Sequence, residues 1–77
     1  MSFPPLDVKK YRLEIAVIDA AVAEHRTRMN LAASLFERRD PRENRMARRE
    51  HELADGALAD ATADYVAFID AERKTAE

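Results

Sequence analysis

Apolar residues recur along the first half of the chain at alternating steps of three and four positions. The series, with one polar member, is Val8, Tyr11, Ile15, Ile18, Val22, His25, Met29, Ala32 and Phe36. Such steps place all of these residues on one face of an α-helix and are typical of a heptad repeat. No Gly or Pro interrupts the series, so it predicts a helix over residues 8–39. The prolines at positions 4 and 5 predict an extended segment over residues 1–7, because proline is disfavoured inside a helix.

A second helix is predicted over residues 41–75. Asp40 is a suitable N-cap, Pro41 fits the first helical position, and Glu43 lies three residues after the cap, so the chain is expected to turn at residues 40–41. The apolar series of this helix is Ala47, His51, Ala54, Leu58, Ala61, Tyr65 and Phe68. The sequence therefore predicts two long helices with a tight turn between them.

The two series match when the helices are laid antiparallel. Facing residues should then have numbers with a constant sum, and pairs such as Ile15 with Tyr65 and Val22 with Leu58 satisfy this condition with sums of about 80. Large residues often face small ones, which fills space without strain. We therefore expect an all-α fold, a coiled-coil-like antiparallel hairpin that forms a single domain over residues 1–77.

The composition indicates that such a hairpin self-associates. The chain has 77 residues, is 47% hydrophobic and contains no Cys, so no disulfide can compensate for a small core. Many apolar residues lie off the two series, and a second copy could cover them in an antiparallel four-helix bundle. The expected oligomer interface consists of Leu13, Val17, Leu31, Leu35, Leu53, Val66 and Ile69.

The region around the turn is strongly basic although the chain carries a net charge of −2. Its arginines are Arg38, Arg39, Arg42, Arg45, Arg48 and Arg49. Arg side chains match the geometry of phosphates and carboxylates, so this cluster is a candidate site for a partner protein or an anion such as RNA or DNA. The alternative is a solvated tip in which these arginines pair with nearby glutamates, as Arg48 and Glu52 would at four-residue spacing. The absence of interleaved aromatic residues favours the solvated tip over a nucleic-acid site.

Two histidines are the only metal-ligand candidates. The antiparallel pairing places His25 and His51 in neighbouring layers of opposite helices, near acidic residues. Neither belongs to a ligand motif such as HxxxH, so a role in setting the register of the helices is favoured over metal binding. The sequence predicts no cofactor.

One resemblance to an enzyme family exists. Arg12, Ile15, Ile18, Asp19, Val22, Arg28, Arg39 and the pair Arg49-Glu50 loosely resemble the pattern of the helical chorismate mutases. That resemblance implies an active site of arginines, a lysine and a glutamate across a helical dimer. However, Arg39 stands where the family has its lysine, no Gln is present, and the chain is short for the family's third helix.

The expected function is therefore binding without catalysis. No Ser-His-Asp order, Gly-rich phosphate loop or paired Cys occurs. We expect a homo-oligomeric protein-interaction module, such as an adaptor, chaperone or regulator of a larger protein. The first alternative is a nucleic-acid-binding hairpin dimer that uses the Arg-rich turn, and a remote one is a chorismate-mutase-like enzyme. Without an apolar run of membrane-spanning or signal-peptide type, the expected location is the cytoplasm.

Overall fold

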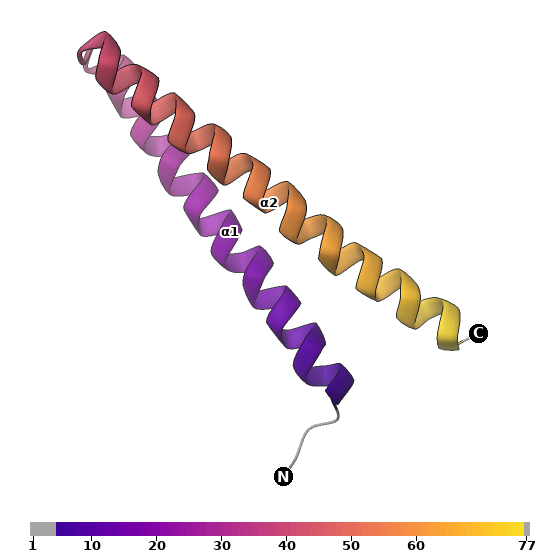
Figure 1. Cartoon of the computed structure of the whole chain (residues 1–77). Helices are drawn as coiled ribbons and strands as arrows, with labels where there is room; N and C mark the ends of the chain where they lie inside the picture. The colour runs from indigo at the N-terminus through magenta and orange to yellow at the C-terminus, as the bar shows by residue number, and fades with distance from the viewer. Residues whose placement is uncertain (1–4, 77) are drawn as a thin grey trace.

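The chain folds as two antiparallel α-helices joined by a short turn. The structure, a computed structural model, describes residues 5–76, and it describes the side chains of residues 8–75. Helix α1 spans Pro5–Phe36 and helix α2 spans Pro41–Ala76, with no strand in the described part of the chain. Figure 1 shows α1 and α2 side by side, close together at the turn and further apart at their free ends. The predicted helical hairpin is confirmed.

Helix α1 is displaced by three residues from its predicted bounds. It begins at Pro5 instead of residue 8. Proline is well suited to the first helical position, since the N–H that it lacks would have no partner there. Of the segment predicted to be extended, residues 1–4 lie outside the described residues and residues 5–7 are helical.

The end of α1 at Phe36, three residues before the predicted end, results from a C-terminal cap. The Arg38 N–H donates to the carbonyl of Leu35 at 3.3 Å, and the Arg39 N–H donates to the carbonyl of Ser34 at 3.0 Å. Arg38 has φ of 53°, the left-handed conformation that this Schellman-type pattern requires. The helix cannot continue past this residue.

The predicted start of α2 at Pro41 is confirmed, although no hydrogen bond from the Glu43 side chain completes a capping box among the described residues. Asp40 Oδ1 accepts a hydrogen bond from the Arg42 N–H at 2.9 Å, as an N-cap residue does, and the Asp40 carbonyl accepts the first helical bond from Asn44 at 3.0 Å. Pro41 occupies the first helical position. The helix runs without a break through Gly56 and ends at Ala76, one residue beyond the predicted end.

The face that α2 turns toward α1 is the predicted one. Ala47 is only 4% exposed and is the one buried hydrophobic residue among those described. The other members of the predicted series are half-buried: His51, Ala54, Leu58, Ala61, Tyr65 and Phe68. The heptad pattern therefore identified the inner face of α2.

The face predicted for α1 is wrong. Every member of its heptad series is exposed, from Val8 to Phe36, the latter at 90%. We call this exposed series the outer stripe: Val8, Tyr11, Ile15, Ile18, Val22, His25, Met29, Ala32 and Phe36. The residues that face α2 are instead half-buried or buried: Leu13, Glu14, Val17, Ala20, Ala21, Glu24, Thr27, Leu31 and Ser34. At 100° per residue, the two sets point about 140° apart around the helix axis.

Hydrogen bonds between polar side chains explain this rotation of α1. The Tyr65 hydroxyl donates to Glu14 at 3.2 Å, the Ser34 hydroxyl donates to the side-chain oxygen of Asn44, and His51 contacts Glu24. If the outer stripe faced α2, these groups would lose their partners, and a polar group buried without a partner destabilises a fold. The prediction considered apolar spacing alone and missed this polar match.

The rotation also moves several residues expected at an oligomer interface. Leu13, Val17 and Leu31 are half-buried against α2 within one chain, because they lie on the inner face of α1. Ile69 is half-buried on α2. The remaining three residues, Leu35, Leu53 and Val66, are exposed. Neither described helix contains an apolar stretch long enough to cross a membrane.

Candidate functional site

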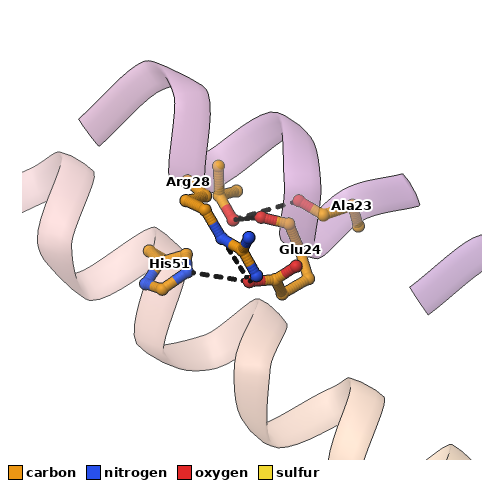
Figure 2. Close-up of polar contacts among 5 residues, drawn as sticks. Ala23, Glu24, Arg28 and His51 are labelled. Atoms are coloured by element: carbon orange, nitrogen blue, oxygen red, sulfur yellow. Dashed lines mark hydrogen bonds and ion pairs between the residues drawn. The ribbon is translucent and has the colours of Figure 1, made fainter. Parts of the chain in front are cut away.

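A buried carboxylate links the two helices near the middle of the hairpin. Glu24 is 6% exposed and its Oε1 accepts hydrogen bonds from Arg28 Nε at 3.0 Å and Nη2 at 2.5 Å. The same oxygen lies 3.2 Å from Nε2 of His51 on α2. Figure 2 shows the Arg28 side chain and the His51 ring converging on Glu24 from the two helices. Glu24 is therefore an acceptor shared between α1 and α2.

These contacts lower the pKa of Glu24. The hydrogen bond from Arg28 is the largest cause and the hydrogen bond from His51 is the second, whereas burial acts in the opposite direction. Glu24 is therefore ionised at neutral pH. A carboxyl group that serves as a general acid needs a raised pKa, so this site has the electrostatics of a structural ion pair.

The polar groups around Glu24 are satisfied within the protein. The Thr27 hydroxyl lies 3.0 Å from the carbonyls of both Ala23 and Glu24, one turn back on its own helix. Figure 2 draws the hydrogen bond to the Ala23 carbonyl as a dashed line. In the part of the chain that the structure describes, no buried side-chain N or O atom lacks a hydrogen-bond partner. The site therefore presents no free buried group to a ligand.

The two histidines do not form a metal site with each other. His51 faces α1 and contacts Glu24, whereas His25 lies on the outer stripe of α1 and is exposed. Among the described side chains, no group of three or more His, Cys, Asp or Glu residues is arranged to hold a metal ion. The neighbouring layers predicted for His25 and His51 are not formed, because α1 is rotated.

The Arg-rich turn is mostly unpaired in this structure. Arg39 donates from Nε to Glu37 Oε2 at 2.8 Å and is half-buried. The other five arginines are exposed and have no ion pair with any described residue: Arg38, Arg42, Arg45, Arg48 and Arg49. The local pairing considered for Arg48 with Glu52 is not formed. The turn therefore carries a concentrated positive charge that local contacts leave largely uncompensated.

A shallow depression of about 360 Å³ lies beside the turn and opens widely to solvent. It is lined by Asn30, Arg39, Glu43, Met46, Ala47 and Glu50. Its one arginine is accompanied by two glutamates, so the lining does not favour an anion. The depression lacks the enclosure and the convergent polar groups of a small-molecule site.

The outer stripe is an apolar part of the surface that the hairpin does not cover. Tyr11, Ile18, Val22 and Met29 are each more than half exposed although all are large and apolar. A compact monomer of this mass, 8.8 kDa, exposes about 4,800 Å². This chain exposes 6393 Å² in total, about 1,600 Å² more, because the hairpin is elongated. The outer stripe lies on this extended surface as a continuous series of exposed apolar side chains.

Comparisons with known proteins give no family, since no family model, curated protein or solved structure matches this chain. The arginines that resemble the chorismate mutase pattern also do not converge within one chain. Arg12 and Arg28 are sixteen residues apart on α1, about 24 Å at the rise of a helix. Arg28 binds Glu24, and Arg39 binds Glu37. The surfaces of the hairpin therefore carry the remaining evidence on its function.

Sequence reasoning missed the three polar contacts between the helices. Glu24 was considered only as one of the acidic residues near His25 and His51, and Glu14 and Ser34 were not considered as partners for α2. A detectable signal did exist, because Glu14 with Tyr65 and Ser34 with Asn44 have sums of 79 and 78 in the antiparallel register. These two pairs of complementary polar residues indicated the inner face of α1, whereas Glu24 with His51 has a sum of 75 and lies outside that register.

Proposed function

We propose that this protein is a non-enzymatic, homo-oligomeric interaction module that binds a larger protein as an adaptor, chaperone or regulator. One observation supports the proposal: the outer stripe is an exposed apolar series that extends along nearly all of α1. Only Ala47 is a buried hydrophobic residue among those described, so one chain has almost no apolar core of its own. The proposal includes a cytoplasmic location and no cofactor.

The first test is the mass of the native chain in solution. Sedimentation equilibrium at micromolar concentration should give a dimer or a larger oligomer. A double variant with Ile18→Lys and Met29→Lys should sediment as a monomer, because two charges then lie in the apolar stripe. The control is a variant with Lys at Ala59 and Ala63, two exposed positions of α2, which should keep the native mass. A monomeric native chain would contradict the proposal.

The second test concerns the partner. The tagged native chain should recover a protein at constant stoichiometry from its host, and that recovery should survive nuclease treatment. Recovery that depends on intact RNA or DNA would instead support the second candidate function.

The second candidate is a nucleic-acid-binding hairpin dimer. The observation that favours it is the set of five exposed arginines around the turn that have no ion pair with a described residue. Phosphate contacts release counterions, so affinity for RNA or DNA would fall steeply with salt concentration. Replacing Arg42, Arg45 and Arg49 by Ala should then reduce the slope of log affinity against log salt concentration by the amount that about three phosphate contacts contribute.

A charge-matched control separates the turn from the net charge of the chain. Replacing Arg12, Arg73 and Lys74 by Ala removes the same charge at the opposite end of the hairpin. That variant should keep the native salt dependence if the turn is the binding site. If both triple variants lose the same amount of salt dependence, the attraction is nonspecific, and the second candidate function is contradicted.

A further inference from the structure

The spacing of the outer stripe from Tyr11 to Phe36 is the same when read in either direction, and Val8 lies outside this symmetric part. From Tyr11 to Phe36 its steps are four, three, four, three, four, three and four. A stripe with this symmetry can meet a reversed copy of itself with every layer in register, as a two-fold axis requires. In that arrangement the numbers of facing residues sum to 47.

The layers formed at this sum are well matched in size. Tyr11 faces the partner's Phe36, Ile15 the partner's Ala32, Ile18 the partner's Met29, and Val22 the partner's His25. Each layer occurs twice because of the two-fold symmetry. Phe36, which is 90% exposed in the hairpin, would be covered by an aromatic ring.

Charges beside the stripe select this register and orientation. Asp19 and Arg26 each follow a residue of the stripe, and when facing residues sum to 47 these flanking positions pair at a sum of 45. Asp19 then lies next to the partner's Arg26, and the symmetric pair repeats the attraction. Asp19 and Arg26 are both exposed, and neither has an ion pair with a described residue of its own chain. The register therefore gives two opposite-charge contacts and no like-charge contact at these flanking positions.

The competing arrangements place like charges together. An antiparallel pairing shifted by one heptad has facing residues at a sum of 40 and these flanking residues at a sum of 38, so it sets Asp19 against the partner's Asp19 and Arg12 against the partner's Arg26. A parallel, in-register pairing sets Glu14 near the partner's Asp19. Like charges across an interface disfavour the wrong partner or register.

The second helix of each chain leaves room for this contact. The face of α1 that binds α2 points about 140° away from the outer stripe, so a partner can cover the stripe without displacing α2. The contact of Glu24 with His51 lies on the inner side and is unaffected.

We propose that a second copy of this chain covers the outer stripe by antiparallel packing of α1 on α1, in the register in which facing residues sum to 47. The inference rests on the proposed function, which requires self-association, and adds the surface, the orientation and the register. The resulting dimer has its two α1 helices at the centre and an α2 helix on each outer side.

Engineered cysteines test the orientation, because the natural chain has no Cys. With Ile18→Cys and Met29→Cys in one chain, each new thiol faces the other thiol of the partner, and oxidation should give a covalent dimer. Within one chain the two positions are about 16 Å apart, too far for a disulfide. Each single variant should stay uncrosslinked, because in an antiparallel dimer the two copies of one position are also about 16 Å apart along the helix axes. If Cys at these positions disrupts the hairpin by circular dichroism, Ile15→Cys with Ala32→Cys makes the same test.

A charge exchange tests the register with exposed residues that the fold does not need. Asp19→Arg and Arg26→Asp should each weaken the dimer about tenfold, because two attractions become repulsions. The double variant should return the dissociation constant to within about twofold of the native value. Two outcomes would contradict this register in a native chain that is dimeric. One is cross-linking of the single cysteine variants, and the other is a double charge variant that dimerises no more tightly than the single charge variants. A monomeric native chain would instead refute the proposed function itself.

Discussion

At the end of α1, Arg38 adopts a backbone conformation that is least strained for glycine. Its φ of 53° lies in the left-handed region, and its N–H closes the cap on the carbonyl of Leu35. A side chain at this position crowds the following carbonyl and costs about 1–2 kcal/mol. The cap therefore forms although the Arg38 side chain strains the backbone at this position.

Replacing Arg38 by Gly should stabilise the hairpin. We expect a gain of about 1 kcal/mol, because the strain removed exceeds the extra freedom that Gly has in the unfolded chain. Urea unfolding of both proteins at one fixed concentration measures this difference. Arg38→Ala is the matched control: it removes the charge but keeps the Cβ, and should give no comparable gain. A loss of stability in the Gly variant would show that the Arg38 side chain contributes more than its backbone strain costs.

Glu24 makes the stability of the hairpin depend on pH. Its pKa is lowered in the folded chain by the hydrogen bonds from Arg28 and His51. The stability that its ionised form contributes is therefore present above its ordinary pKa and is lost as pH falls through the lower folded value. Glu24→Gln should unfold at a lower temperature than the native chain at pH 7, and the difference should shrink as pH falls below about 4.

A control separates this effect from general acid denaturation. Glu52 is exposed on α2 and has no ion pair with a described residue, so Glu52→Gln should follow the native chain at every pH. Thermal unfolding followed by circular dichroism from pH 3 to pH 7 gives both comparisons. A deficit of Glu24→Gln that stays the same over this whole range would contradict the role of the ionised carboxylate.

The two helices differ in how well the sequence predicted their orientation. Helix α2 has one apolar face, so the positions from Ala47 to Phe68 identified its inner side. Helix α1 has two: the outer stripe, and a second series that includes Leu13, Val17 and Leu31. Spacing alone could not choose between them, and the regular heptad stripe was the wrong choice because polar partners on α2 favour the other face. The same ambiguity misplaced His25 in the candidate metal site.

Within α2, Gly56 weakens a helix that continues through it. Nothing lies within 4 Å of the position that a Cβ on Gly56 would occupy, and its φ is not positive. Gly56→Ala should therefore stabilise the protein by about 0.5–1 kcal/mol, through the higher helix propensity of Ala. Ala57→Gly, at the exposed neighbouring position, should cost a similar amount. Measured destabilisation by Gly56→Ala would mean that a partner approaches α2 closely at this point.

At the scale of the whole molecule, the hairpin shows how little a two-helix chain can bury. The contacts between α1 and α2 are largely those of half-buried side chains and hydrogen bonds, supplemented by Lys9, whose Nζ lies 5.5 Å from the centre of the Phe68 ring. The sequence predicted the architecture because caps and helix length are local properties. It did not predict the polar contacts, since these depend on which faces meet across the turn.

Self-association should therefore appear in the thermal stability of the chain. If the native state is a dimer and unfolding separates the copies, each tenfold increase in protein concentration adds about 1.4 kcal/mol to the stability of the dimer. For an assembly of this size the Tm should rise by about 3 to 6 °C per tenfold step. The variant with Ile18→Lys and Met29→Lys should melt at a lower temperature that does not change with concentration. A native Tm that is constant over a hundredfold range would show that one chain is stable by itself, and that its apolar stripe contributes nothing to folding.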